Sequence, residues 1–410
     1  MCTRCKTVVN LEQLETRIMG KPQIYFANMG HGEAIAFEIN GQWYLRDFGE
    51  SNSKRVADTQ CNINKIYAQN CPNCPISDFI SASPKWDVIV SHSHKDHVCG
   101  FEKLFEDKKS KIFRNAFIPS QYSLGDCADK TCFLQYIEAN LHIYCFAKTY
   151  KYRKSAEFFL TMPIIMDYLA EQTHYLYIGC SDTSFPGTVF APGKNLVQDD
   201  GRNGYNINNA LKNYYAKYNN ENINDFRNTA EEIFQIFSPY LIQYDIHINK
   251  DNQNDCKKIC EKIEKLKKRH AKTSFDVRLL QRDVKGSIDD RSLVFDIFFQ
   301  YEDAVNVLFL GDNSDASINR ISVNFKEYYD YIKASHHGSR GGRALKKIYS
   351  AGSKTKTTIC CCGLGHRSGE VNSEYYDISQ KVLWTEKKDY WNDPLQCDLK
   401  KCKIEPQDLN

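Results

Sequence analysis

The stretch VIVSHSHKDHVCG, residues 88–100, holds three of the eleven histidines of the chain within six positions. Its apolar start, VIV, indicates a buried strand, and the histidines follow where that strand ends. In extended backbone His92 and His94 point to the same side, because side chains alternate with a period of two. Asp96 and His97 come next, at the start of a predicted helix, where the chain turns toward an adjacent point. Four ligand-type side chains on one loop predict a metal site with room for two ions.

Two later segments show the same arrangement, an apolar strand that ends in ligand-type side chains. VLFLGDNSD places Asp312 after a strand, where a carboxylate can bridge two cations. YIKASHHGSR places His336 and His337 at another strand end. Asp47 ends the strand-like segment QWYLRD and is better placed to orient ligands than to bind a metal itself. Imidazole and carboxylate ligands together suit Zn²⁺ or Mn²⁺.

Composition and charge exclude several classes of protein. The chain has 410 residues, 42% apolar and 26% charged, which is ordinary for a globular protein. A net charge of +3 is too small to recruit nucleic acid by bulk charge, so such a partner requires a local basic patch. No stretch approaches the ~18 consecutive apolar residues of a membrane span, and the N-terminal residues lack a signal-peptide core. We therefore expect a cytoplasmic protein without a membrane partner.

The seventeen cysteines are scattered along the chain and favour reduced thiols over a disulfide framework. Cys2 with Cys5, and Cys71 with Cys74, have the CxxC spacing of structural zinc sites. The two pairs lie about seventy residues apart, beyond the usual spacing of a zinc ribbon. Unligated thiols are the favoured interpretation, and a structural metal at these pairs stays an open alternative.

Strand and helix patterns divide the chain into segments. Apolar bursts within 23–48, joined by glycine turns, predict a β-meander, and the polar, Cys/Pro-rich residues 50–84 predict a loop or insertion. Residues 205–285 are charged and helical in pattern, with an amphipathic helix at 256–270 whose basic face is either solvated or in contact with a polyanion. Strand signals return from residue 292.

Three further predictions concern the last ninety or so residues. We expect a helix around 322–331, and a strand at 357–365 followed by a helix over 373–383. Residues 384–410 show no core pattern and are expected to form a tail.

The ordered motifs resemble those of the metallo-β-lactamase superfamily, for which HxHxDH after a strand is specific. The likeness is closest to the soluble domain of ComEC-type competence proteins and their free-standing relatives. NMGHGEAIAFEI and LRDFGES stand where that subgroup opens, DDRSLVF precedes FLGD, and HHGS occurs unaltered at 336–339. The resemblance covers residues 23–105 and about 289–380. It implies one domain over 1–410 with an α/β fold, the metallo-β-lactamase αββα sandwich, carrying a helical insertion at 205–285.

The resemblance further implies two divalent metal ions, Zn or Mn. Their ligands fall into three groups: His92 and His94 for one ion, Asp96, His97 and His337 for the other, and Asp312 as the bridge. Asp47 lies behind these ligands, and Asp96 and Asp312 are the expected catalytic carboxylates.

Some positions depart from the family. Most members supply a third histidine to the first ion, and His174 and His247 are the candidates by position, although neither lies in a recognisable motif. Asp289-Asp290-Arg291-Ser292 stands where the competence-type proteins carry Asn-Asn-Ser. In the late loop GHRSGEV, His366 replaces an expected Asn and Glu370 an expected His, so His366 is a candidate substrate contact.

Cations near the expected site favour a phosphodiester substrate, because they offset charge that builds on oxygen during attack at phosphorus. Lys95 lies within the metal loop and is the expected catalytic cation, and Arg340 and Arg343 follow HHGS. Lys346 and Lys347 continue the basic run and could track a nucleic-acid backbone. His336, Ser339 and Arg340 are further candidates for contacts to the ligands or the substrate.

The sequence thus predicts a metal-dependent phosphodiesterase or nuclease acting on nucleic acid or another phosphodiester. A metallo-hydrolase of a thioester, lactone or small phosphoester shares every metal ligand and stays an alternative. Two others are a non-catalytic protein that keeps the fold and an active effector controlled by a protein partner, for which 205–285 offers a contact surface.

Overall fold

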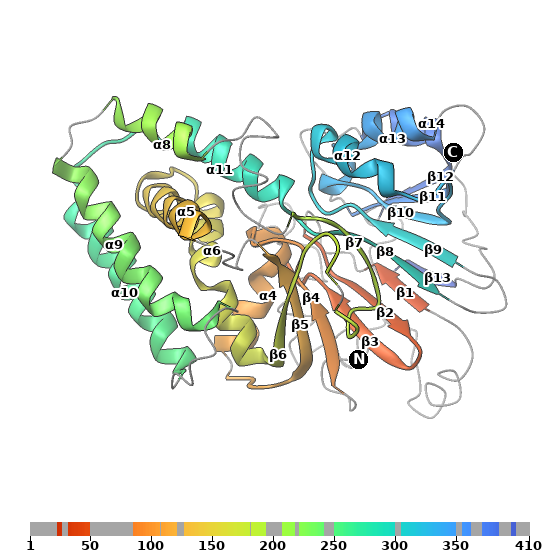
Figure 1. Cartoon of the computed structure of the whole chain (residues 1–410), viewed down its shortest axis with the longest axis horizontal. Helices are drawn as coiled ribbons and strands as arrows, with labels where there is room; N and C mark the ends of the chain where they lie inside the picture. Colours follow the sequence, from red (N-terminus) through yellow and green to blue (C-terminus); the bar gives the residue numbers. More distant parts are fainter. Residues whose placement is uncertain are drawn as a thin grey trace, which may run out of the picture.

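The structure is a computed structural model in which two mixed β-sheets lie face to face and helices cover the outer face of each (Figure 1). The α/β class expected from the sequence is confirmed. The described residues are 23–26, 32–49, 85–106, 108–120, 127–180, 182–193, 207–217, 221–241, 250–299, 305–349, 355–361, 371–384 and 395–398.

The first sheet has seven strands in the order β13-β1-β2-β3-β4-β5-β6. Their bounds are β1 Gln23–Phe26, β2 Ile35–Ile39, β3 Gln42–Arg46, β4 Trp86–Ile89, β5 Phe113–Pro119, β6 Ala170–Leu176 and β13 Leu395–Asp398. β2 and β3 form a hairpin through Asn40 and Gly41, whose positive φ angles of 52° and 82° suit the Asn-Gly turn. From β3 to β6 all pairs are parallel, so the chain leaves β3 and β4 at the same edge.

The second sheet has six strands in the order β12-β11-β10-β9-β8-β7. Their bounds are β7 Gly187–Ala191, β8 Val294–Phe299, β9 Val305–Phe309, β10 Tyr331–Lys333, β11 Thr355–Cys360 and β12 Ser379–Trp384. β7, β8 and β9 pair antiparallel, and β9 to β12 pair parallel. β9 and β10 therefore also end at a common edge.

Alternating side chains place one core between the sheets and one on each outer face. In β2, Phe37 faces the second sheet, where it stacks on Phe309 of β9 with ring centroids 5.8 Å apart. Its neighbour Ala36 belongs to the core on the helical side. In β9, Leu308 faces the outer helices of the second sheet. This period of two is what both half-buried strands and a four-layer sandwich require.

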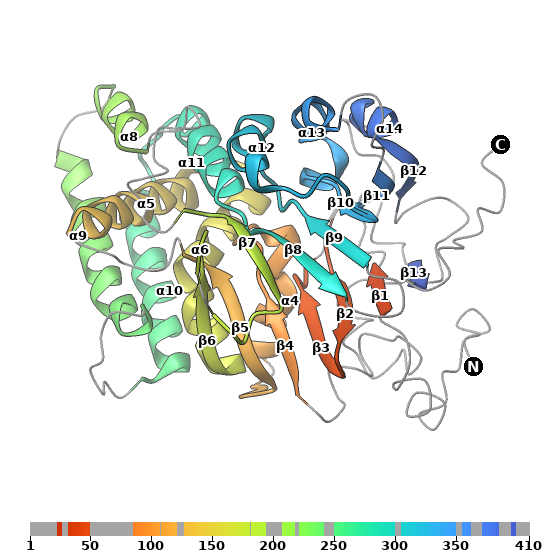
Figure 2. The ribbon, with the colours of Figure 1, turned by 45° about the vertical axis from the view of Figure 1, so that its right-hand side comes forward.

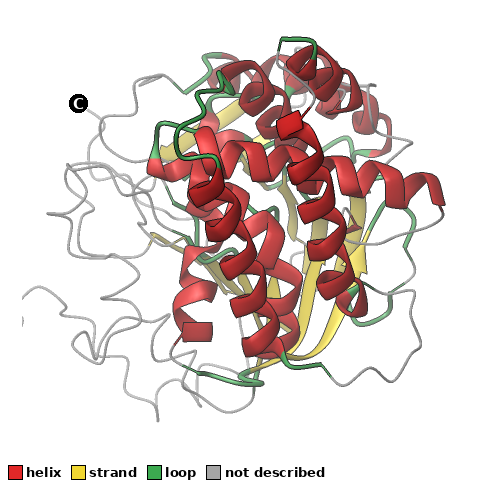
Figure 3. Ribbon diagram, turned by 90° about the vertical axis from the view of Figure 1, so that its left-hand side faces the viewer, coloured by secondary structure: helices red, strands yellow, loops and turns green. Residues whose placement is uncertain are grey.

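Helices of very different extent cover the two sheets (Figures 1 and 2). The second sheet carries α12 Asp315–Ile321, α13 Gly342–Ile348 and α14 Glu374–Ile378. The first sheet carries a thick layer that faces the viewer in Figure 3. Its helices are α4 Lys95–Glu106, α5 Cys127–Phe146, α6 Tyr150–Leu169, α8 Ile207–Tyr215, α9 Glu221–Phe237, α10 Asn252–Arg269 and α11 Arg278–Asp290. Single 3-10 turns occur at Ser238–Tyr240, Ser322–Asn324 and His336–Gly338.

The predicted amphipathic helix at 256–270 corresponds to α10. Asp251 caps its N-terminus by accepting a hydrogen bond from Asn254 N–H. Its apolar side chains are buried, and most of its basic side chains form ion pairs, among them Lys262 with Glu232 of α9. These pairs favour a solvated, charge-balanced face over a surface open to a polyanion.

Two secondary-structure predictions in the C-terminal part are wrong. The helix expected around 322–331 lies earlier, as α12, because Ser314 caps it by accepting from Ser317 N–H at 3.3 Å. The helix expected over 373–383 ends at Ile378, since the next residues pair with β11 as the parallel strand β12. In the expected tail, the short strand β13 pairs antiparallel with β1.

Several sequence predictions fall outside the described residues: the segment 50–84 and residues Cys2, Cys5, Cys71, Cys74, His247, His366 and Glu370. The cysteines whose side chains are described form no disulfide with one another. Among the described helices, none combines the length and the apolar character needed to cross a bilayer.

Candidate metal centre

Four strands end at one edge of the sandwich, and the chain after each carries buried polar side chains. Asp47 follows β3, residues 91–94 follow β4, Asp312 follows β9, and residues 335–337 follow β10. A backbone hydrogen bond of 2.9 Å from Leu293 N–H to Ser91 O ties the end of β4 to the start of β8. The two sheets therefore bring residues more than two hundred positions apart into one cluster.

Asp96, His97 and His337 form one set of ligand atoms that all lie within 4.8 Å of one another. Asp96 and His97 stand in the first turn of α4, and His337 follows β10. Asp96 Oδ2 lies 3.7 Å from His337 Nε2. These are the three residues that the sequence assigned to one ion.

Hydrogen bonds fix which ring nitrogen of each histidine faces the cluster. His337 Nδ1 donates to the Cys361 carbonyl at 2.7 Å, and His97 Nδ1 donates to Asp47 Oδ2 at 2.9 Å. Both partners only accept, so in the neutral ring each Nε2 keeps its lone pair for the cluster. Asp47 thus holds the His97 ring in this orientation, and its predicted role behind a metal ligand stays a prediction.

The same reasoning applies to His92. Ser91 Oγ donates its hydrogen to Asp47 Oδ2 at 2.7 Å, so it can only accept from His92 Nδ1 at 3.0 Å. His92 Nε2 then faces His94 Nδ1, 3.0 Å away. One carboxylate, Asp47, therefore sets the orientation of two histidines.

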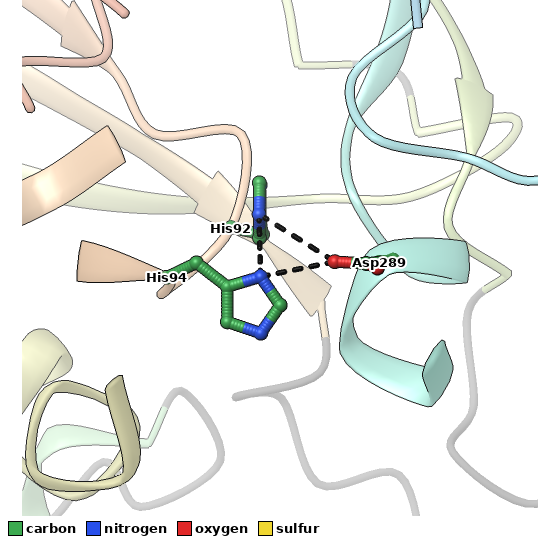
Figure 4. Close-up of side chains that lie close together, drawn as sticks. All are labelled: His92, His94 and Asp289. Carbon is green, nitrogen blue, oxygen red and sulfur yellow. Dashed lines mark hydrogen bonds and ion pairs between the residues drawn. The ribbon is translucent and has the colours of Figure 1, made fainter. Parts of the chain in front are cut away.

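Asp289 completes the set around His92 and His94 (Figure 4). It lies at the C-terminal end of α11, and its Oδ1 is 2.9 Å from His94 Nδ1 and 4.0 Å from His92 Nε2. Its other oxygen, Oδ2, is held by Arg340 at 2.9 Å and Lys285 at 3.2 Å. A carboxylate from a helix thus stands where a third histidine was expected.

Sequence reasoning missed Asp289 as a ligand. The sequence shows an Asp pair in place of Asn-Asn before β8, and no clear third histidine for the first ion. The interpretation did not consider that a carboxylate of this pair could take the place of that histidine. The candidate His174 lies instead on β6, with Nδ1 2.7 Å from Asp182 Oδ2 and Nε2 3.1 Å from Asn115 Oδ1. It belongs to none of the ligand sets formed by the described residues.

Asp312 stands between the two sets. Its Oδ2 lies 3.6 Å from Nε2 of both His92 and His97. The turn before it needs Gly311, whose φ is +56° and where an added Cβ would lie 2.4 Å from Ser292 Oγ. That hydroxyl accepts a 2.7 Å hydrogen bond from Asp312 N–H, which fixes the carboxylate at the centre of the cluster.

His336 lies beside the set formed by His92, His94 and Asp289, so it is a candidate ligand as well as a candidate substrate contact. Its Nδ1 is 3.3 Å from Asp312 Oδ2 and 3.7 Å from Asp289 Oδ2, and the three residues form a further ligand set. Burial lowers the pKa of His336 to about 3, so the ring is neutral at physiological pH.

The carboxyl groups of the cluster are held in the charged form. Burial raises the pKa of Asp96, Asp289 and Asp312, but neighbouring Lys and His side chains outweigh it and hold all three values well below the ordinary range. Burial opposes a charge on His97, yet Asp312 and Asp47 raise its pKa to about 9. Without a metal ion, the cluster therefore takes up a proton at the His97 ring, which would otherwise bind the metal.

Buried polar atoms without a hydrogen-bond partner test whether the side chains of the cluster suit a metal ion. The cluster atoms without a hydrogen-bond partner are His97 Nε2, Asp289 Oδ1, Asp312 Oδ1, His336 Nδ1 and His337 Nε2. Each such atom costs about 1–3 kcal/mol when left unpaired. They are nitrogen and carboxylate-oxygen donors at mutual distances typical of ligands, so the residues present fit divalent ions.

A second buried charge network lies behind the metal ligands. Glu33 forms ion pairs with Arg46 of β3 and with Lys333 of β10, and all three side chains are fully buried. Arg46 also lies 3.3 Å from Asp47 Oδ2. The network joins the two sheets next to the residue that orients the histidines.

The predicted substrate contacts lie at different places. Lys95 is buried, and its backbone N–H donates to Ser155 Oγ at 3.1 Å. Ser339 Oγ donates to the His336 carbonyl at 2.8 Å. Arg340 holds Asp289, as described above. Arg343 and Lys346 are exposed and pair with the α14 residue Glu374 at 3.4 Å and with Asp377 at 2.7 Å. A lysine that the sequence did not indicate, Lys151 of α6, pairs with Asp96 at 2.7 Å.

No family model matches this chain, and no curated protein matches it. The interpretation of the site therefore depends on its geometry and on the sequence motifs.

Proposed function

We propose that the protein is a metal-dependent hydrolase with the metallo-β-lactamase αββα sandwich, and that it cleaves phosphodiesters with the aid of two divalent ions, Zn or Mn. The fold part is supported by two mixed sheets packed face to face between helices. It is also supported by the position of the HxHxDH loop after a parallel strand at their common edge.

One observation carries the proposal: Asp312 Oδ2 lies 3.6 Å from the facing nitrogens of two separate ligand sets. His92, His94 and Asp289 would hold one ion, and Asp96, His97 and His337 the other, with Asp312 shared. Two ions so held supply an acidified water and a clamp for the oxygens of the reacting group.

The chain's own residues prepare this chemistry. Asp47 and Ser91 keep the lone pairs of His92 and His97 directed at the ions, and the Cys361 carbonyl does the same for His337. Burial of the ligands excludes bulk water, which strengthens every charge interaction in the site.

Charge favours a phosphodiester over a neutral thioester or lactone. Lys151, Lys285 and Arg340 all lie within ion-pair distance of the metal-ligand carboxylates. Cations so close to the ligands attract an anionic substrate and stabilise added negative charge on its oxygens.

Metal analysis combined with cleavage assays tests the proposal. Wild type and Asp96→Ala would be incubated with single- and double-stranded DNA, RNA and bis-p-nitrophenyl phosphate. We expect two ions per wild-type chain and metal-dependent cleavage of at least one substrate, lost in Asp96→Ala. Asp182→Ala removes a carboxylate that pairs with His174 outside the ligand sets, and serves as the control. A wild type that binds two ions but cleaves no phosphodiester would sink the proposal, and thioesters and lactones would be assayed next.

A further inference from the structure

Lys151 reaches the metal cluster from the helical layer. It is the second residue of α6, and its Nζ lies 2.7 Å from Asp96 Oδ2. The Lys151 side chain is 47% exposed, whereas that of Asp96 is 8% exposed. Lys151 is therefore the solvent-exposed partner of a buried carboxylate. Asp96 raises the pKa of Lys151, so the group is charged at neutral pH.

Asp96 has a second partner in the proposed site. The same oxygen lies 3.7 Å from His337 Nε2, a buried atom without a hydrogen-bond partner. An ion held by Asp96, His97 and His337 would neutralise part of the carboxylate charge that holds Lys151. The lysine would then keep its three donors beside the site with a weaker partner. A lysine ammonium in that situation binds phosphate as a point charge.

Cations stand at both ends of the row of ligands. Contacts run from Lys151 to Asp96, through Asp312 in the middle, to Asp289, which is held by Lys285 and Arg340. Lys285 and Arg340 share one carboxylate oxygen and have side chains only 27% and 31% exposed. They are committed to positioning Asp289, which leaves Lys151 as the more exposed cation at the opposite end.

We propose that Lys151 is a substrate-binding residue that contacts a phosphate adjacent to the one being cleaved. The two ions would bind the oxygens of the cleaved phosphate, so an anion at Lys151 would be a second phosphate. The preferred substrate is then a nucleic-acid strand with consecutive phosphates rather than an isolated phosphodiester. This inference rests on the proposed function and assigns a substrate contact to the helical layer.

The test compares one substrate with a single phosphate and one with several. Lys151→Met and Lys151→Arg would be assayed on bis-p-nitrophenyl phosphate and on a single-stranded oligonucleotide, with metal content measured in parallel. Loss of one charge-assisted contact predicts a rise of about tenfold in KM for the oligonucleotide in Lys151→Met. Activity on the small diester should fall by less than activity on the oligonucleotide, the metal content should stay at the wild-type value, and Lys151→Arg should recover most of the loss. Lys148→Met, at an exposed lysine just before α6, is the matched control.

Binding separates this inference from the proposed function. Affinity for an oligonucleotide with phosphorothioate linkages would be measured by fluorescence polarisation with metal-loaded protein. If wild type binds the strand but cleaves nothing, the hydrolase proposal fails, and a loss of about tenfold in affinity in Lys151→Met still supports the contact. Equal losses on both substrates, unchanged strand affinity in Lys151→Met, or no strand binding by wild type overturns it.

Discussion

Asp47 contacts none of the carboxylate oxygens in the two proposed ligand sets. Its own two oxygens nevertheless set the orientation of the His92 and His97 rings. One oxygen accepts from Ser91 N–H, and the other accepts from Ser91 Oγ and His97 Nδ1. Replacement by alanine frees both rings to rotate or to change tautomer. We expect Asp47→Ala to lower metal affinity by roughly 10–100-fold, the usual effect of losing such a partner. Competition with a chelator of known affinity measures this, and Asp276→Ala, at an exposed carboxylate, should leave affinity unchanged.

Asp289 carries the prediction that distinguishes the two ions. Asp289 belongs to the set with His92 and His94 and to the set with Asp312 and His336, and to no set that contains Asp96 or His337. We expect Asp289→Ala to reduce the bound metal from two ions toward one, because His92 and His94 would keep only the shared Asp312 as a carboxylate ligand. The adjacent Asp290, whose Oδ1 accepts from Ser314 N–H, provides the control Asp290→Asn. Retention of two ions by Asp289→Ala would show that another residue completes the set.

At this scale, the sequence was informative wherever a ligand follows a strand. Apolar strands ending in His or Asp identified the HSHKDH loop, Asp312 and His337, because parallel strands bring their ends to one edge. Asp289 and Lys151 come instead from helices, Asp289 from the last turn of α11 and Lys151 from the first turn of α6. No local pattern separates them from other charged residues, since only the three-dimensional arrangement brings them to the cluster.

Among the elements, the loop after β3 and the first turn of α4 approach each other closely. Phe48 N–H donates to the His97 carbonyl at 2.7 Å, and a Cβ on Gly49 would lie 2.1 Å from the backbone carbon of Asp96. Gly49→Ala therefore has to displace the turn that presents two ligands. We expect it to lower the free energy of unfolding by about 1–3 kcal/mol and to weaken metal binding as well.

Urea unfolding with and without metal checks this prediction. At Gly41, where φ is +82° and no atom lies within 4 Å of an added Cβ, alanine should cost only its backbone strain and leave metal affinity intact. Equal behaviour of Gly41→Ala and Gly49→Ala in metal binding would contradict the proposed role of the close approach.

The helical layer contains a buried histidine with a consequence for acid stability. His142 of α5 stacks on Phe226 of α9 with centroids 3.7 Å apart, and its Nε2 lies 3.1 Å from Tyr215 OH. Burial, and secondarily His270, lower its pKa well below the ordinary 6.5. The ring is thus neutral when folded and gains a proton on unfolding below pH 6.5, so its stabilising contribution is full above that pH and declines below it.

We expect stability to fall more steeply with acidification in wild type than in His142→Phe. Between pH 6 and 5 the difference in slope should approach about 1.4 kcal/mol per pH unit, the effect of one proton. Urea unfolding monitored by helical circular dichroism at several pH values measures both slopes. Parallel slopes would place the acid sensitivity elsewhere in the chain.

Element types followed from the sequence where periodicity was long and uniform, as in α10 and β9. The segment 373–383 shows the opposite case, because its first residues form α14 and the rest pairs with β11. Both patterns are short, and the neighbouring strand decides between them. β13 likewise depends on an edge of β1 formed some 370 residues earlier, which local propensity does not reveal.

On the scale of the molecule, the ligands come from both sheets, so metal binding and the union of the sheets are coupled. Residues 92–97 follow the first sheet, and Asp312 and His337 follow the second. We expect chelation to lower the melting temperature, since ions at one hundred times their Kd contribute about 2.7 kcal/mol per site. Differential scanning fluorimetry with added Zn²⁺, Mn²⁺ and chelator measures the shift, and Asp96→Ala should reduce it. An identical melting temperature in all conditions would contradict metal binding to the folded chain.

The distribution of the ligands also bears on how the protein is made. Ribosomes deliver HSHKDH early, but Asp289, Asp312 and His337 are synthesised only in the last third of the chain. An unfinished polypeptide carries His92, His94, Asp96 and His97 without the later carboxylates and strand ends that would enclose an ion. On the proposed function, metal loading would therefore follow synthesis of the chain, and prematurely terminated products would lack the proposed centre.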